Sequence, residues 1–271
     1  MKQPFLYDHQ IDGVPVLPGV MGIEAMAETA RLLFPDLYVA AIEDVNFLAP
    51  FKFYKNQPRV VTVQAVYSAD GDDIVADCRL TGSRKLHGQD EAEKTTHFTG
   101  RVRLTAKAPK TGKGSAPVTD AKKKAAASDI YKVYFHGPAY QVIDGAWRSG
   151  KQIVARFAEK LPPNHEPENL PLLTAPRLTE LCFQASSLTG LAEHSRLGLP
   201  GGLCEMKILA QPKGAVYAVV VAGTDGTAGS HDISIVDAKG KVYITISGYR
   251  TTELPATVSE ELAAPMKKAL K

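Results

Sequence analysis

The first residue that could carry out acid–base chemistry is His9, which precedes a loop rich in turn-forming residues. That loop contains Gly13 and the pair Pro18-Gly19, and an apolar, alanine-rich segment follows it. Apolar residues recur in this segment at helical spacing, which predicts a buried helix: Ile23, Met26, Ala27, Ala30 and Leu33. Pro18 suits the first turn of such a helix, because its missing N–H costs nothing there. Since a helix N-terminus favours partial negative charge, a histidine beside it indicates proton transfer near a carbonyl group.

A carboxyl group in the second half of the chain could complement His9. Residues 178–192 form a second apolar segment of helical character, and they include Glu180 and Gln184. The spacing i, i+4 places Glu180 and Gln184 on one face of that helix. The neighbours of Glu180 are mostly apolar, so we expect burial to raise the pKa of its carboxyl and keep it protonated as an acid. The alternative is a solvated glutamate that pairs with Arg177.

Both candidate helices lie among segments that predict antiparallel strands. In the first hundred residues, β-rich runs cover 38–47, 60–66, 74–81 and 95–105. Further strands are predicted within 140–158 and at 203–209, 216–222, 233–236 and 242–254. This pattern describes two helix-plus-sheet halves, which makes the fold class α+β. We predict a structural role for His136, which lies at a His-Gly-Pro turn.

Residues 107–127 separate the two halves and differ from both in composition. They are rich in lysine, alanine, glycine and proline, and Val118 is their one large apolar residue. This composition predicts a linker between a first unit at residues 1–106 and a second unit at residues 128–271. The alternative for its lysine run is a patch that docks a partner or an acidic surface.

The overall composition restricts the possible classes of function. Hydrophobic residues make up 44% of the 271 residues and charged residues 23%, as in globular proteins with a substantial core. A net charge of +3 is too small to indicate nucleic acid or membrane binding. Three cysteines without paired spacing argue against a disulfide framework and against zinc. With neither a leader-like apolar stretch nor a run of about 20 apolar residues, the sequence predicts a cytoplasmic protein without a membrane span.

The spacing His-x3-Gly-x4-Pro, formed by His9, Gly13 and Pro18, resembles the signature of polyketide synthase dehydratase domains. The resemblance implies a double-hotdog fold, in which two antiparallel sheets each wrap a central helix. Residues 1–106 would then form the N-terminal hotdog and residues 128–271 the C-terminal one. Because only eight residues precede His9, where the family usually has strands, we expect the first hotdog to lack its first strands.

The second predicted helix resembles the same family. Pro176, Glu180 and Gln184 match a motif of proline, then aspartate four residues on, then glutamine or histidine four further. Glutamate takes the place of the usual aspartate, and its longer side chain moves the carboxyl by about 1.5 Å. The chemistry of the site is compatible with this change, while its geometry differs from the family pattern.

Other segments of the chain extend the resemblance in the same order. Residues 134–141 resemble the family's tyrosine-glycine-proline segment, with His136 in place of the usual tyrosine. Residues around both helices look closest to dehydratase-like regions of polyunsaturated fatty acid-type and related bacterial synthases. The resemblance implies substrate contacts from several of these positions, namely Gly13, Pro18, Gly19, Tyr134, Gly137, Pro138, Leu199 and Pro200.

A dehydratase of this family would eliminate water from β-hydroxyacyl thioesters carried on an acyl carrier protein. The resemblance implies that His9 removes the proton beside the carbonyl, Glu180 protonates the hydroxyl and Gln184 positions Glu180. Backbone N–H groups near Gly13 and at the start of the first helix would polarise the thioester carbonyl. Neither a metal nor another cofactor is required. The expected partners are the carrier-bound substrate, neighbouring synthase domains and a second copy of the chain.

Two alternatives remain open on the sequence alone. The first is a catalytically silent, dehydratase-like domain that holds neighbouring domains or dimerises, which the aspartate-to-glutamate change and the short N-terminus favour. The second is another hotdog activity, such as thioester hydrolysis or double-bond isomerisation. Cavity geometry discriminates between them, because catalysis requires the side chains of His9 and Glu180 to face one cavity.

Overall fold

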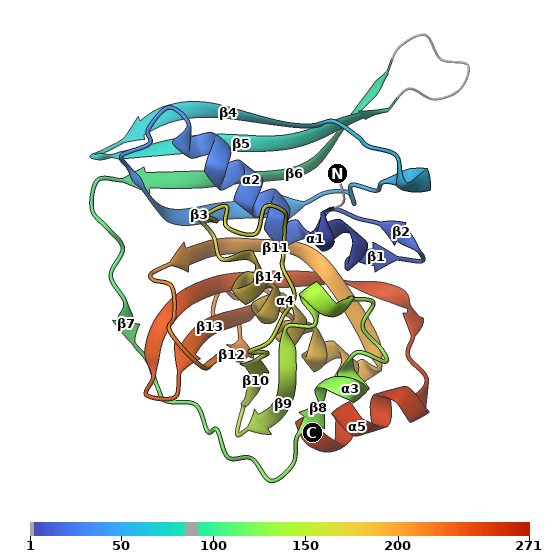
Figure 1. Ribbon diagram of the computed structural model, residues 1–271. Helices are drawn as coiled ribbons and strands as arrows, with labels where there is room; N and C mark the ends of the chain where they lie inside the picture. The colour runs from blue at the N-terminus through green and yellow to red at the C-terminus, as the bar shows by residue number, and fades with distance from the viewer. Residues whose placement is uncertain (1–2, 85–91) are drawn as a thin grey trace.

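The computed structural model describes residues 3–84 and 92–271 (Figure 1). The elements of the first part of the chain are α1 (Pro4–Tyr7), β1 (Gln10–Ile11), β2 (Val14–Pro15), α2 (Gly19–Arg31), β3 (Tyr38–Phe47), η1 (Tyr54–Asn56), β4 (Val61–Asp70), β5 (Asp73–Arg84) and β6 (Glu93–Thr105). Those of the second part are β7 (Gly112–Lys113), β8 (Ala125–Ala126), α3 (Ala127–Ile130), η2 (Pro138–Tyr140), β9 (Ile143–Ser149), β10 (Gln152–Phe157), α4 (Pro176–His194), β11 (Arg196–Ile208), β12 (Val216–Ala222), β13 (His231–Asp237), β14 (Lys241–Thr257) and α5 (Glu260–Leu270).

The first predicted helix is α2, and four antiparallel strands in the order β4-β5-β6-β3 curve around it (Figure 1). Ile23, Met26 and the neighbouring alanines of its apolar face are fully buried. Gly22 allows the sheet to approach closely, because a Cβ there would lie 2.2 Å from the Phe98 ring. The prediction that Leu33 continues this face is wrong: the helix ends at Arg31 and Leu33 is 67% exposed. Pro35 disfavours helical backbone at Phe34, the residue before it, so the helix cannot continue past Leu33.

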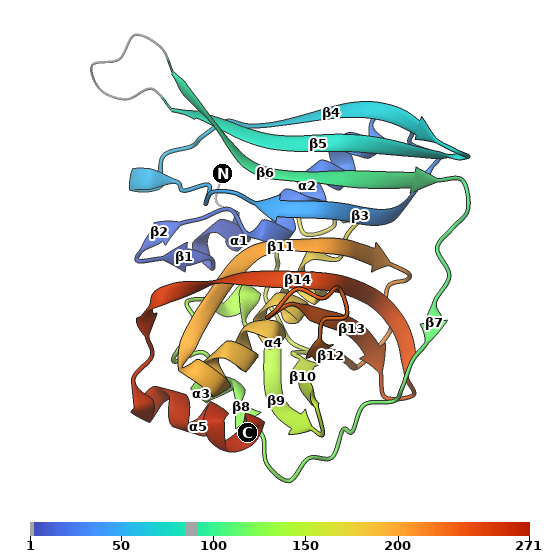
Figure 2. The same ribbon diagram turned by 180° about the vertical axis from the view of Figure 1, so that it is seen from behind.

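The second predicted helix is α4, which is buried along most of its length. The strands β11, β14, β13, β12, β10, β9 and β8 follow one another around it (Figure 2). The helix α5 packs against α4 and α3 beside the C-terminus, so the polar, amphipathic tail of the sequence closes the lower end of this half. Ser259 caps α5 by accepting a hydrogen bond from the Leu262 N–H.

The two halves join edge to edge through β3 and β11, which pair antiparallel from Ile42 and Met206 to Asn46 and Gly202. Gly202 is required at this seam, because a Cβ there would lie 2.6 Å from the carbonyl oxygen of Val45. Within the described residues, the strands β3 to β14 therefore form one continuous twelve-stranded sheet that wraps two helices in succession, while β1 and β2 pair only with each other.

The predicted linker, residues 107–127, runs down one side of the molecule from β6 toward β8 (Figures 1 and 2). It contains more structure than its composition indicates. Within it, β7 pairs with β14, β8 pairs with β9, and the carbonyl of Val118 accepts a hydrogen bond from Trp147 Nε1 at 2.8 Å. The division into units at residues 1–106 and 128–271 stays a prediction.

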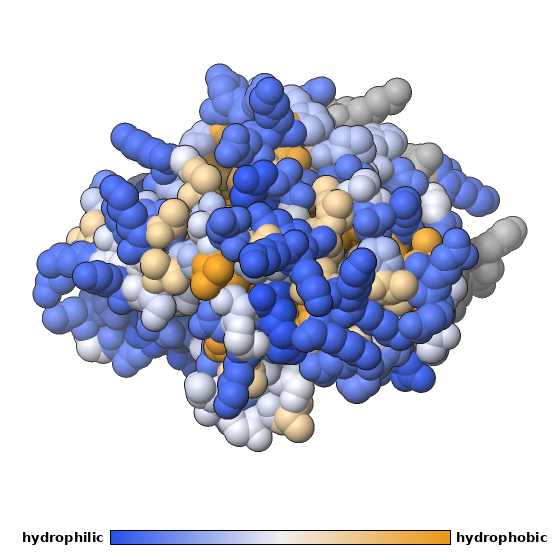
Figure 3. Space-filling view, turned by 90° about the horizontal axis from the view of Figure 1, so that it is seen from below, coloured by the Kyte–Doolittle hydropathy of each residue, from blue (hydrophilic) through white to orange (hydrophobic). Residues whose placement is uncertain are grey.

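The face of the molecule seen from below is mainly hydrophilic, with small, separate apolar patches (Figure 3). Such scattered patches are ordinary for a protein surface and do not by themselves indicate a docking site. Of the helices in the described ranges, none could serve as a membrane span.

Candidate active site

His9 is held in place by the hairpin of β1 and β2, which folds back beside it. Asp12 and Gly13 both have positive φ, as a type I′ hairpin turn requires, and the Val16 N–H donates to the carbonyl of His9 at 3.0 Å. The Nδ1 atom of His9 lies 2.9 Å from the carbonyl oxygen of Val16. Since a carbonyl only accepts, Nδ1 carries the proton and Nε2 keeps a free lone pair.

The surroundings of His9 keep its imidazole neutral. Burial, reinforced by the neighbouring His136, lowers the pKa of His9 to about 4, although Glu180 and the carbonyl of Val16 act in the opposite direction. The ring also lies edge-on to Phe135, with centroids 5.1 Å apart. His9 is therefore a neutral imidazole near pH 7, with its lone pair on Nε2.

Glu180 and Gln184 lie on the same side of α4, one turn apart, as the sequence predicts. Both are buried, and Gln184 Nε2 donates to Glu180 Oε1 at 3.0 Å and to the carbonyl of Tyr140 at 2.9 Å. The Tyr131 hydroxyl donates to Gln184 Oε1 at 2.9 Å, which fixes the orientation of the amide. Gln184 is thus oriented by two partners and holds the carboxyl of Glu180 in turn.

His136 is the second group that binds Glu180, with Nε2 3.1 Å from Oε1. Its ring stacks on that of Phe135 at 4.3 Å and lies edge-on to His9 at 5.4 Å. The prediction of a structural role for His136 therefore did not include its contact with Glu180. The sequence signal that could have revealed it is an imidazole at the position where the resembling family carries a tyrosine.

The prediction that Glu180 has a raised pKa is wrong. Burial, the largest single effect, does act in that direction, but the hydrogen bond and charge of His136, the positive charge that His9 gains at acidic pH and the amide of Gln184 together outweigh it. The net effect is a pKa of Glu180 below its ordinary value. The apolar sequence neighbours of Glu180 could not reveal this, because the groups responsible come from other segments and from the next helical turn.

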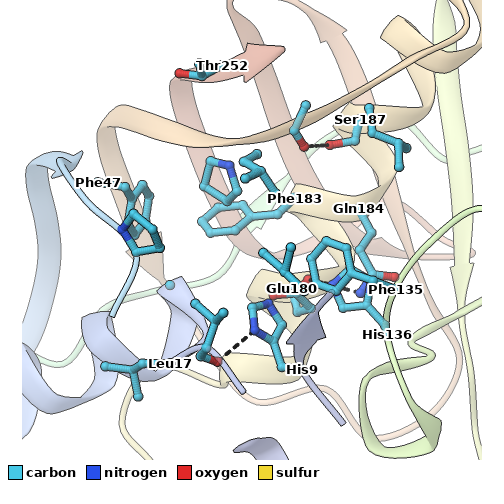
Figure 4. A pocket seen from close by; sticks show the side chains of 18 of the residues that line it. His9, Leu17, Phe47, Phe135, His136, Glu180, Phe183, Gln184, Ser187 and Thr252 are labelled. Carbon is cyan, nitrogen blue, oxygen red and sulfur yellow. Dashed lines mark hydrogen bonds and ion pairs between the residues drawn. The ribbon is translucent and has the colours of Figure 1, made fainter. Parts of the chain in front are cut away.

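A cavity of about 290 Å³ lies between the two halves and contains these groups. Figure 4 shows His9, Glu180, His136 and Gln184 in the same cavity, which also contains Phe47 and Phe183. Phe183 stacks on Tyr249 at 4.5 Å and gives the cavity an apolar wall. Such a site suits an acyl chain with one polar reacting centre.

Of the predicted substrate-binding residues, four line the cavity: Gly19, Tyr134, Leu199 and Pro200. The Tyr134 hydroxyl also donates to the carbonyl of Gln184 at 2.8 Å, so it anchors α4. The other four predicted residues are not among those that line it, namely Gly13, Pro18, Gly137 and Pro138.

These four residues instead shape the backbone around His9, His136 and the start of α2. Gly13 forms the β1–β2 turn, Pro18 precedes α2, and Pro138 begins η2. The Gly137 N–H donates to the carbonyl of Asp8 at 2.8 Å, and a Cβ at Gly137 would lie 2.5 Å from Asp8 Oδ1. Gly137 is therefore needed for close approach of two segments.

Comparison with known proteins places this chain in one family. A family model described as "Polyketide synthase dehydratase N-terminal domain" matches residues 105–261, and one described as "Polyketide synthase dehydratase domain" matches residues 1–76. The chain belongs to the polyketide synthase dehydratase family, whose domains are hydro-lyases acting on β-hydroxyacyl thioesters. Family membership confirms the predicted dehydratase class and does not favour the silent alternative.

The curated relatives are much longer proteins. Polyketide synthase ThaG of Burkholderia thailandensis is 25% identical over 97% of this chain, and the match spans 5% of that synthase. A polyunsaturated fatty acid synthase from Thraustochytrium sp. is 31% identical over 56% of this chain, again 5% of the relative. The similar sequences are thus segments of multidomain synthases.

Solved structures share the fold. The dehydratase domain from the CurF module of curacin polyketide synthase superposes with a TM-score of 0.75 at 18% identity, covering 92% of this chain and 89% of that one. A trans-AT polyketide synthase dehydratase domain from Brevibacillus brevis gives 0.67 at 20% identity, covering 92% and 90%. These likenesses confirm the predicted α+β double-hotdog fold.

Proposed function

We propose that this chain removes water from a β-hydroxyacyl thioester, with His9 as the base and Glu180 as part of the acid that protonates the leaving hydroxyl. The observation that supports this most directly is the shared cavity, which receives His9 from the first half of the chain and Glu180 from α4 (Figure 4). The Cα–H and Cβ–O bonds of the substrate break, a double bond forms between the two carbons, and the hydroxyl leaves as water.

His9 takes the proton from the carbon next to the thioester carbonyl. Its Nε2 is available for this step because Nδ1 is committed to the carbonyl of Val16. A base with a low pKa is a weak one, so it needs a substrate whose Cα–H is made more acidic by the polarised carbonyl.

The start of α2 can polarise that carbonyl. Met21 and Gly22 donate back to the carbonyl of Pro18, so the N–H groups of Gly19 and Val20 precede the first hydrogen bonds of the helix. Gly19 lines the cavity, which puts this helix end beside the substrate. The partial positive charge of a helix N-terminus stabilises a developing enolate oxygen.

The substrate is carried, in this proposal, on an acyl carrier protein, and neighbouring domains of a multidomain synthase supply and remove it. The lengths of the curated relatives support such a context. A second copy of the chain as partner and a cytoplasmic location are parts of the same proposal. The apolar cavity wall supports an acyl chain as the group bound beside the reacting carbons.

The test is turnover of a short β-hydroxyacyl pantetheine thioester, together with hydration of the matching enoyl thioester, both followed by mass. His9→Asn and Glu180→Gln should each lower kcat/KM by about 10² to 10⁴-fold. The matched control is His165→Asn, because His165 Nε2 also lies 3.1 Å from a backbone carbonyl oxygen, that of Leu170, and neither residue is among those that line the cavity. A folded His9→Asn protein with wild-type turnover would exclude His9 as the base.

A further inference from the structure

We infer that His136 holds the proton that leaves with the substrate hydroxyl, and that His136 and Glu180 act together as one acid. The inference deepens the proposed dehydration and rests on it. An ionised carboxyl has no proton to give, so a site that favours ionised Glu180 needs the proton on a bonded neighbour. His136 is a neighbour that can carry it.

The geometry of the pair supports a shared proton. His136 Nε2 and Glu180 Oε1 are 3.1 Å apart, both side chains are less than a tenth exposed, and both line the cavity. Gln184 Nε2 donates to the same carboxylate oxygen, so Oε1 accepts two hydrogen bonds when His136 Nε2 carries the proton. Low solvent access strengthens the attraction between the two groups.

The two histidines of the site differ in what fixes their protons. At His9, the carbonyl of Val16 holds a proton on Nδ1. At His136, Nδ1 is buried and has no hydrogen-bond partner within the described part of the chain. Glu180 at Nε2 is therefore the contact that determines where the proton of His136 lies.

The other titratable groups around the pair stay neutral near pH 7. Burial holds the pKa of His9 at about 4 and raises the pKa of the surrounding phenols and thiol. These groups come from the segment after β8, from η2, from α4 and from β14: Tyr131, Tyr134, Tyr140, Cys182 and Tyr249. The exchangeable proton of the site thus belongs to His136 and Glu180.

The proton count of the reaction balances. The pair gives one proton to the leaving hydroxyl, which departs as water, and His9 Nε2 gains one from the carbon beside the carbonyl. The enzyme ends with the same number of protons but with one displaced from the pair to His9. That proton must return before the next turnover, and the ring centroids of His9 and His136 are 5.4 Å apart.

The first test is the pH profile of kcat/KM for the whole chain with the pantetheine thioester, comparing wild type with His136→Gln. Two groups that share a proton bind it at least as tightly as either alone, so His136→Gln should move the alkaline limb to lower pH by about 0.5 unit or more, as an order of magnitude. At pH 7, we expect a loss of roughly 10 to 100-fold. The control is His194→Gln, the same change beside Glu193 at the exposed end of α4, which should leave both limbs in place.

The second test reads the proton without turnover, by ¹⁵N shifts of the histidine rings assigned with the His136→Gln protein. The inference predicts that a larger fraction of His136 carries protons on both nitrogens in wild type than in Glu180→Gln at the same pH. The inference would be overturned if the alkaline limb of His136→Gln stayed where it is in wild type. It would also be overturned if His136 were protonated to the same extent in wild type and in Glu180→Gln. If wild type lacks turnover while the ring shifts follow Glu180, the shared proton stands and the proposed dehydration fails.

Discussion

Shortening Glu180 to aspartate should lower activity in this chain, although aspartate is the residue that the resembling family usually carries. Glu180 Oε1 now lies 3.1 Å from His136 Nε2 and 3.0 Å from Gln184 Nε2. Removing one methylene withdraws the carboxyl by about 1.5 Å and breaks both contacts. A misplacement of about 1 Å at a reacting group can cost about 10²-fold, which corresponds to roughly 2.7 kcal/mol in the barrier.

Replacing His136 with tyrosine should lower activity for the opposite reason. The hydroxyl of tyrosine lies farther from its Cα than the Nε2 of histidine does, by on the order of 2 Å. It would overlap the carboxyl of Glu180, and overpacking of this kind costs about 1–3 kcal/mol. The two single changes therefore alter the gap between positions 136 and 180 in opposite directions.

The double variant Glu180→Asp with His136→Tyr should lose less activity than the two single losses combined, because the two length changes nearly cancel, although it lacks the imidazole that carries the proton. The assay is a double-mutant cycle on kcat/KM for the short thioester, with urea unfolding to verify that each variant is folded. Glu193→Asp with His194→Tyr makes the same changes at the exposed end of α4 and serves as the control cycle. Additive losses, or a fully active Glu180→Asp protein, would refute the matched-length explanation.

Three further predictions concern stability and can be measured by urea unfolding. A histidine in the unfolded chain gains its proton near pH 6.5, whereas buried His9 gains it only near pH 4. The contribution of neutral His9 to the free energy of unfolding is therefore complete above pH 6.5 and falls by about 3 kcal/mol as the pH drops to 4. A His9→Asn protein whose free energy of unfolding has the same pH slope would contradict this. Glu24→Gln should cost about 2–4 kcal/mol, because the buried carboxylate accepts from Leu173 N, Thr174 N and Thr174 Oγ1, and an amide offers one acceptor atom; an unchanged midpoint would be inconsistent with these bonds. Tyr249→Phe should leave stability unchanged or raise it by up to about 1 kcal/mol, since the buried hydroxyl has no partner among the described residues; a clear loss would indicate a bond to water.

The fold follows from the sequence to the extent that burial patterns are local. The apolar spacing of α2 and the alternating strands after it identify a helix wrapped by a sheet, and the resemblance supplies the doubling. The pairing of β3 with β11 is different, because it joins residues about 160 positions apart in the chain through backbone bonds that carry no side-chain signature. For the same reason the sequence does not predict β7, which lies in a segment of linker composition and pairs its two residues with β14.

A site residue could be predicted from the sequence when its own side chain has acid–base or hydrogen-bonding chemistry and when it also belongs to a recognisable motif. His9, Glu180 and Gln184 meet these conditions, and the structure brings them into one cavity. The state of Glu180 was not predictable, because His136 is 44 residues away in the sequence and reaches Glu180 through the fold. Gly137 was predicted as a substrate contact, but its lack of a side chain serves the close approach to Asp8.

The contacts that join the two halves also set the distance between His9 and Glu180. The carbonyl of Asp8 accepts from the Gly137 N–H and its carboxylate from the Ala139 N–H, which ties the segment of the base to the segment of His136. On the other side, Glu24 of α2 binds the residues just before α4, the helix that carries Glu180. A rotation of one half against the other would strain these hydrogen bonds, whose acceptors include the carboxylates of Asp8 and Glu24. Since His9 and Glu180 come from different halves, the proposed elimination depends on this junction, and neither half alone contains both the base and the acid.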